Sequence, residues 1–197
     1  MKEVVREQIL QAIQTHRDMV SEFEANWVET VAAAADAVTS ALRSGRTIYT
    51  CGNGGSAADA QHIAAELLVR LSRERMALPA VALSSDNSVL TSIGNDYGYE
   101  KVFVRQVEGL VGKNDLLWAI STSGSSPNVI AAAELAKKKD AFVLAFTGRA
   151  NSRLEKIADI CFCADDKSTA RSQEMHQLAY HIVCDLVERN FCEKLNQ

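Results

Sequence analysis

Two ionisable side chains in the segment CGNGGSAADAQHIAAEL (51–67) have the types and the spacing that chemistry requires. His62 and Glu66 are four residues apart, so on a helix they lie on the same face, about one turn from each other. An imidazole and a carboxylate in this arrangement can transfer protons or bind a metal ion. An ordinary solvated pair on a helix surface has the same spacing, so the two residues alone leave both interpretations open.

A second group of candidate ligands lies in the segment ARSQEMHQLAYHIVCDLVE (170–188). Gln173 and His181 are eight residues apart and fall within about 80° of each other around a helix axis, whereas His176 points well away from His181. A metal ion could bind to His181 together with the pair on the earlier helix, with the amide oxygen of Gln173 as a fourth ligand. Zinc prefers histidine, cysteine and carboxylate ligands, so a glutamine is an unusual member of such a set.

Two loops rich in glycine and serine each stand between a strand and a helix. In the first, Ser56 and Asp59 fit a capping box; in the second, STSGSSPN (121–128), Ser126 is a natural N-cap and Pro127 takes the first helical position. Free N–H groups at such a helix start favour an anion. Neither loop carries the dinucleotide fingerprint or a Walker lysine. The pattern indicates a compact phosphorylated metabolite, or else only capped helices. Four hydroxyls of the second loop are candidate phosphate donors: Ser121, Thr122, Ser123 and Ser126.

Short apolar strands that alternate with helices must position these loops. The pattern predicts an α/β domain with a five-stranded parallel sheet covered by helices on both faces. Residues 1–44 predict a helical extension, which we expect to pack partly on the domain and partly on another subunit. No linker divides the chain, so residues 1–197 are expected to form a single domain. The expected strands are 47–51, 78–83, 115–121, 141–147 and 160–164, and the main expected helices are 56–72, 127–138 and 169–191.

Composition excludes several classes of protein. The 197 residues carry a formal net charge of −4 without a basic cluster, which argues against a nucleic-acid or anionic-membrane surface. The opening residues MKEVVREQ are too charged for a signal peptide, and no apolar run reaches membrane-spanning length. We therefore expect a cytoplasmic protein. The five cysteines are an odd number and are expected to be free and mostly buried.

Four blocks of the sequence together resemble the sedoheptulose-7-phosphate isomerases (phosphoheptose isomerases), a family with the sugar isomerase (SIS) fold. The blocks are CGNGGSAADAQHIAAEL, LPAVALSSDNSVLTSIGNDYGYEKVF, AISTSGSSPNVI and ARSQEMHQLAYHIVCDLVE, and they span nearly the whole chain. The resemblance implies conversion of sedoheptulose 7-phosphate to D-glycero-D-manno-heptose 7-phosphate through an ene-diol. This is the first step towards ADP- or GDP-heptose, and so towards glycans such as lipopolysaccharide. It also implies a homotetramer.

The resemblance further implies roles for individual residues. Glu66 and His181 match the acid–base pair. One zinc ion per subunit would be bound by His62, Glu66, Gln173 and His181. Substrate contacts are implied at Asn53, Gly54, Gly55, Ser56, Glu66, Asn95, Asp96, Ser121, Thr122, Ser123, Ser126 and Gln173.

Departures from the family pattern are few. Ser125 and Pro127 replace residues common in relatives, and Ala170 stands where some relatives have an aspartate. Arg70, one turn beyond Glu66, is a weaker candidate that is equally well explained as a surface residue.

Three rival functions share the fold. The first is a non-catalytic protein that binds the replication initiator; Glu66 and His181 argue for the enzyme because that branch lacks ionisable residues there. A sugar-sensing transcription regulator would need a DNA-binding domain, and 44 acidic-leaning helical residues are too few and insufficiently basic for one. Another sugar-phosphate isomerase with the same chemistry is the third.

Overall fold

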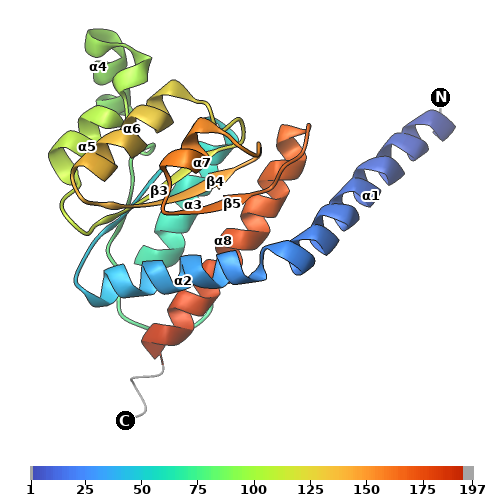
Figure 1. Ribbon diagram of the computed structural model, residues 1–197, viewed down its shortest axis with the longest axis horizontal. Helices are drawn as coiled ribbons and strands as arrows, with labels where there is room; N and C mark the ends of the chain where they lie inside the picture. The colour runs from blue at the N-terminus through green and yellow to red at the C-terminus, as the bar shows by residue number, and fades with distance from the viewer. Residues whose placement is uncertain (1, 193–197) are drawn as a thin grey trace.

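The computed structural model describes residues 2–192, which form one parallel sheet flanked by helices (Figure 1). The strands are β1 (Ile48–Cys51), β2 (Ala80–Ala82), β3 (Leu116–Ser121), β4 (Phe142–Thr147) and β5 (Ile160–Cys163). The α-helices are α1 (Lys2–Asn26), α2 (Val28–Arg43), α3 (Gly55–Leu68), α4 (Asn87–Tyr97), α5 (Val104–Leu110), α6 (Pro127–Lys138), α7 (Arg153–Ile157) and α8 (Thr169–Cys192), and a 3-10 turn, η1, spans Tyr99–Lys101.

The structure confirms the expected five-stranded parallel sheet, and its strand order β2-β1-β3-β4-β5 is that of a doubly wound, flavodoxin-like fold. In this topology the direction of winding reverses between β1 and β3, and ligands bind at the carboxyl ends of the strands beside that point. Ile48 pairs with Leu116 and Cys51 pairs with Ala119, so β1 and β3 run in register. The two loops that follow these strands therefore leave the sheet side by side.

The alternation of side chains along β3 divides the interior into two cores. Leu116, Trp118 and Ile120 pack with residues of α2, α3 and α8. Leu117 and Ala119 face the opposite side and pack with residues of α5 and α6. Because helices cover both faces, every residue of β3 is buried, which explains the doubly apolar strands in the sequence.

The N-terminal 44 residues are helical as predicted, but Trp27 interrupts them and two helices result. Phe23 and Trp27 both pack against Phe162, with ring centroids 5.3 and 5.5 Å away. The chain turns at this anchor, so α2 continues along the sheet with Val38 fully buried. Helix α1 instead projects from the body of the molecule (Figure 1).

The helix predicted for 56–72 ends earlier, at Leu68. Side chains form hydrogen bonds with backbone groups that would pair within the helix if it continued. The Arg75 guanidinium donates to the carbonyl oxygens of Glu66 (2.7 Å) and Met76 (2.8 Å). The Glu188 carboxylate accepts hydrogen bonds from the three backbone N–H groups of residues 71–73, at 2.9 to 3.0 Å. The predicted strand 78–83 is correspondingly reduced to β2, whereas the other strands begin and end within one residue of the prediction.

Two further expectations concern cysteines and membranes. All five cysteines are free, and burial raises the pKa of the Cys51 thiol to about 12. Among residues 2–192, no helix combines the length and the apolar character needed to cross a bilayer.

Candidate functional site

The loop after β1 places a short, flexible backbone at the start of α3. Gly54 is the N-cap, with a φ of +57° that a glycine adopts without strain. A methyl group on Gly55 would overlap the side-chain amide of Gln173, so α8 contacts this loop directly. The predicted capping box is wrong: α3 begins at Gly55 without a side-chain cap, and Ser56 and Asp59 are buried within its first turns. The helix starts earlier because the glycine supplies the turn.

Side chains from α3 and α8 meet at the candidate catalytic centre. One ligand atom each from His62, Glu66 and His181 lies within 4.8 Å of the others. His62 Nε2 is 3.0 Å from Glu66 Oε1, and the two imidazole rings have their centroids 5.0 Å apart. The structure thus brings together three residues that are separated by up to 119 positions in the sequence.

The atoms of this cluster suit a metal ion. Two imidazoles and one carboxylate are a donor set typical of a catalytic zinc site that keeps a position open. Glu66 Oε2 is buried yet has no hydrogen-bond partner, which is unusual for a carboxylate oxygen unless another ligand occupies it. The residues present therefore fit a metal site.

A further layer of polar groups lies behind the cluster. The Tyr180 hydroxyl is 2.9 Å from His62 Nδ1. Burial raises the pKa of Asp59, although a hydrogen bond with Gln177 and the nearby His62 and His181 oppose this shift. Burial and the charge of Asp59 raise the pKa of Tyr180, so its hydroxyl remains protonated.

The loop after β3 gathers hydroxyl groups in front of α6. Ser121 Oγ lies 3.3 Å from Ser123 Oγ and 3.0 Å from Ser126 Oγ. Ser126 is the N-cap and Pro127 is the first residue of α6, as the sequence predicts. Thr122 is half-buried in the same loop. The hydroxyls therefore converge at the N-terminus of a twelve-residue helix, where a phosphate is favoured.

An amide pair that the sequence did not reveal links the two loops. Asn53 and Asn128 each donate one hydrogen bond to the other, both of 2.9 Å. The Tyr99 hydroxyl donates to Asn53 Oδ1 at 3.0 Å, and buried Asn128 also accepts from the Val129 N–H. The Asn53 amide is therefore largely occupied within the protein. The only available signal was a polar residue at position 128 on the apolar face of a helix.

Other predicted residues lie outside this arrangement within the described chain. Asn95 and Asp96 are exposed near the end of α4, and the Asn95 amide donates to the Asp96 carboxylate at 2.8 Å. Arg70 follows α3 and contacts Glu74 at 3.4 Å, with half of its side chain exposed. Neither group contacts the cluster of His62, Glu66 and His181 through a hydrogen bond in residues 2–192.

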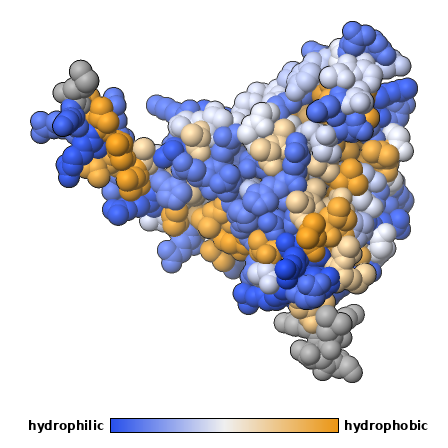
Figure 2. All heavy atoms as spheres, turned by 180° about the vertical axis from the view of Figure 1, so that it is seen from behind, coloured by the Kyte–Doolittle hydropathy of each residue, from blue (hydrophilic) through white to orange (hydrophobic). Residues whose placement is uncertain are grey.

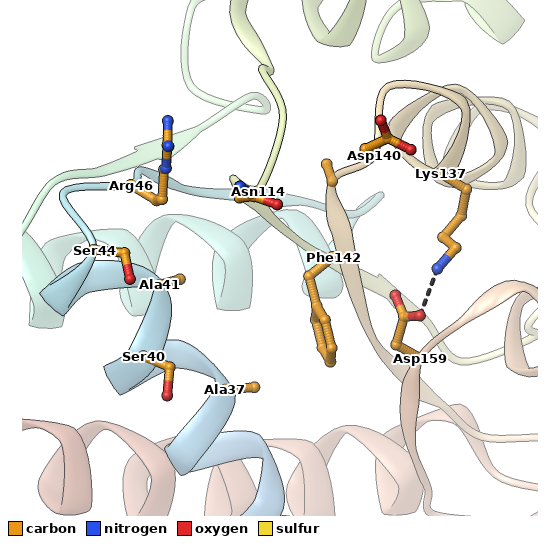
Figure 3. Close-up of a pocket in the computed structure, with 11 residues that line it drawn as sticks. Ala37, Ser40, Ala41, Ser44, Arg46, Asn114, Lys137, Asp140, Phe142 and Asp159 are labelled. Atoms are coloured by element: carbon orange, nitrogen blue, oxygen red, sulfur yellow. Dashed lines mark hydrogen bonds and ion pairs between the residues drawn. The ribbon is translucent and has the colours of Figure 1, made fainter.

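A broad hollow lies at the opposite edge of the sheet (Figure 3). It is bordered by the end of α2 and by the turns that precede the strands, with Arg46, Asn114 and Asp140 around its rim. Lys137 and Asp159 form an ion pair on one side (Figure 3). None of the predicted site residues lines this hollow, and parallel sheets bind ligands at their carboxyl edge, so the candidate site remains with α3 and α8.

Comparison with known proteins gives a consistent assignment. The SIS domain family matches residues 13–148. The phosphoheptose isomerase of Helicobacter hepaticus is 51% identical over 163 residues, which cover 83% of each chain. That of Geobacter metallireducens is 44% identical over 94% of this chain and 98% of its own. The chain belongs to the phosphoheptose isomerase family.

A solved structure extends this phosphoheptose isomerase likeness to the fold. The phosphoheptose isomerase of Neisseria gonorrhoeae superimposes with a TM-score of 0.89 at 40% sequence identity, covering 94% of this chain and 99% of that one. Because the superposition covers nearly all of both chains, the likeness extends to the fold as a whole.

Proposed function

We propose that this chain converts D-sedoheptulose 7-phosphate to D-glycero-D-manno-heptose 7-phosphate. The observation that carries the proposal is that Glu66 of α3 and His181 of α8 lie in one cluster. Each of these helices is preceded by a loop at the carboxyl edge of the sheet. Membership of the phosphoheptose isomerase family supports it. The same comparisons favour the enzyme over a protein that binds the replication initiator.

The reaction needs proton transfer between adjacent carbons of the open-chain sugar. Glu66 acts as the base that removes a proton from C1, which gives the ene-diol, and the proton is returned at C2 to leave an aldehyde at C1. His181 transfers protons between the two oxygens. Only Oε1 of Glu66 is engaged by His62, so Oε2 is the oxygen open to a ligand, which is the substrate proton when Glu66 acts as the base and the metal ion when it acts as a metal ligand.

The metal ligands in this proposal are His62, Glu66 and His181, with Gln173 as the fourth. Zinc bound there would stabilise negative charge that develops on the substrate oxygens. The protein's own part is to hold its two imidazoles and its carboxylate within 4.8 Å of one another before any ligand arrives. A carboxylate that binds a metal is a weaker base, so Glu66 would remove the C1 proton most readily when it does not bind the metal; otherwise the metal would assist while another group takes the proton.

The phosphate is assigned to the hydroxyl loop. Ser121, Ser123 and Ser126 present their oxygens within 3.3 Å of a neighbour, beside the start of α6. The remaining substrate contacts that we propose are Asn53, Gly54, Gly55, Ser56, Glu66, Asn95, Asp96, Thr122 and Gln173. The exposed position of Asn95 and Asp96 fits a contact made across a subunit boundary rather than within one chain.

The assembly that we propose is a homotetramer of single SIS domains (1–197), with α1 in the interface. An apolar band runs along α1 (Figure 2). Val5, Ile9 and Ile13 in this helix are 49%, 56% and 45% exposed. A second copy of the chain would cover this band, and the projecting position of the helix supports this arrangement (Figure 1).

Turnover of sedoheptulose 7-phosphate, followed by NMR, tests the proposal. Zinc-loaded wild-type protein should produce the aldose, and Glu66→Gln should lose at least a hundredfold in kcat because an amide cannot accept the C1 proton. Glu74→Gln is a matched control, since Glu74 is a nearby glutamate whose side chain is 86% exposed. Absence of turnover in folded wild-type protein that still binds the sugar phosphate would favour the binding-protein alternative.

A further inference from the structure

We propose that Tyr180 is a positioning residue that holds the His62 ring at Nδ1, whichever ring nitrogen carries the proton, and thereby strengthens zinc binding. This inference rests on the metal site of the proposed function. It concerns a side chain that contacts His62 at Nδ1, whereas Nε2 is the nitrogen that faces Glu66.

The geometry fixes the His62 ring at both of its nitrogens. Nδ1 lies 2.9 Å from the Tyr180 hydroxyl on α8, and Nε2 lies 3.0 Å from Glu66 Oε1 on α3. Although 46% of the His62 side chain is exposed, contacts from two different helices hold the ring. Tyr180 is itself fully buried, so its hydroxyl has a fixed position from which to orient the imidazole.

The position of the proton on the His62 ring explains why a hydroxyl group suits this position. A carboxylate only accepts hydrogen bonds, so the bond to Glu66 places the proton of a neutral His62 ring on Nε2. Nδ1 then accepts from the Tyr180 O–H. When Nε2 binds a metal ion, the proton of the neutral ring belongs on Nδ1, and the hydroxyl oxygen must accept it. A phenol can reverse its role by rotating one C–O bond, whereas a carboxylate or an ammonium group cannot.

The rest of the tyrosine ring makes contacts that do not depend on the hydroxyl. Its centroid lies 5.5 Å from the His62 ring and 4.5 Å from the His181 ring. Tyr180→Phe preserves these ring contacts and removes only the hydrogen bond. Loss of such an outer partner of a metal-binding histidine weakens metal affinity by about 10- to 100-fold.

Tyr49→Phe provides a matched control. Tyr49 is also buried, and its hydroxyl donates to the Leu110 carbonyl oxygen at 2.9 Å, but it belongs to the core on the other face of the sheet. This variant therefore loses one tyrosine hydroxyl and one hydrogen bond on the other face of the sheet from the cluster.

The test measures zinc affinity of metal-stripped protein by competition with a chromophoric chelator. We expect the Kd of Tyr180→Phe for zinc to rise by about 10- to 100-fold and that of Tyr49→Phe to stay within about twofold of wild type. Equal zinc affinities of wild type and Tyr180→Phe would overturn the role of Tyr180 alone. Failure of the proposed function is recognised separately, as absence of turnover in the wild type.

A second measurement needs no variant and holds if Tyr180→Phe fails to fold. Nitrogen-15 NMR of the metal-free wild-type protein reports which nitrogen of His62 carries the proton. We expect the Nε2–H tautomer without zinc and the Nδ1–H form after zinc is added. A metal-free ring that exchanges between both tautomers would contradict the inference, because a ring held at Nδ1 by Tyr180 and at Nε2 by Glu66 adopts a single tautomer.

Discussion

Asn53 and Asn128 hold each other by two amide hydrogen bonds of 2.9 Å, one in each direction, across the gap between the loops after β1 and β3. The pair joins the loop that starts α3 to the loop that we assign to the phosphate. We therefore expect substrate recognition to depend on Asn128, although this residue is itself buried.

Replacement of Asn128 by alanine is expected to separate these loops. The Asn53 amide loses its fixed partner, so we expect KM for sedoheptulose 7-phosphate to rise by about tenfold or more and unfolding free energy to fall by about 1–3 kcal/mol. Steady-state kinetics and urea unfolding measure the two effects. Asn190→Ala, near the far end of α8, is the control. A stability loss with unchanged KM would mean that the pair only stabilises the fold.

The Glu188 carboxylate is expected to be a major contributor to stability. Burial alone would raise its pKa, but hydrogen bonds from the N–H groups of residues 71–73 hold the pKa below its usual range. Glu188→Gln removes the charge next to buried Arg75, whose Nε lies 3.8 Å away. Breaking a buried ion pair costs about 3–5 kcal/mol.

Chemical unfolding of Glu188→Gln and of Asp185→Asn provides the comparison. Asp185 contacts Arg73 and Arg189, but its side chain is 30% exposed, so its loss should cost no more than about 1 kcal/mol. Similar losses of unfolding free energy in the two variants would show that Glu188 contributes no more to stability than the partly exposed Asp185.

His176 is expected to make the protein less stable in mild acid. Burial lowers the pKa of this ring to about 4, below the ordinary value of 6.5, and a hydrogen bond to the Thr147 carbonyl oxygen only partly opposes the shift. Between these pH values the unfolded chain binds a proton on His176 and the folded chain does not. The free energy of unfolding therefore has its full value above pH 6.5 and falls by about 3 kcal/mol as the pH drops towards 4.

The measurement is the free energy of unfolding between pH 4 and pH 8 for wild type and His176→Gln. The amide of glutamine has no titrating ring, so the variant should show a flatter dependence on pH in this range. Parallel curves for the two proteins would rule out His176 as the source of acid sensitivity.

A charge in the apolar band of α1 is expected to dissociate the proposed tetramer. Ile9→Glu places a carboxylate where the second copy would pack, and an unpaired buried charge is strongly unfavourable. Gln11→Glu introduces the same side chain on the opposite side of the helix. Size-exclusion chromatography with light scattering should show a smaller species for Ile9→Glu only. A monomeric wild type would contradict the assembly itself.

The sequence predicted the parts of the fold that depend on local pattern. Strands such as 116–121 carry apolar side chains on both faces, so helices must cover both faces of the sheet. This pattern predicted the layers of the fold and the parallel sheet. The interruption at Trp27 was not predictable, because it depends on Phe162, which is 135 residues away. The end of α3 at Leu68 likewise depends on Glu188, which only the folded chain brings to that turn.

The candidate site shows the same division. The spacing of His62 and Glu66 predicted that they share a helix face, and the structure places His181 beside them. Asn128 and Tyr180 escaped notice because an asparagine or a tyrosine in a helix has no distinctive spacing. Their importance comes from a partner on another element, Asn53 in one case and His62 in the other.

Helix α8 carries three contacts at nearly regular intervals: Gln173 at the Gly55 loop, His181 in the cluster and Glu188 at the turn after α3. Each interval is seven or eight residues, which is about two turns or roughly 11 Å. Inserting one residue between them would rotate everything downstream by about 100° and detach two contacts from the third. Evolution can therefore exchange side chains along this helix far more readily than it can change the helix's length.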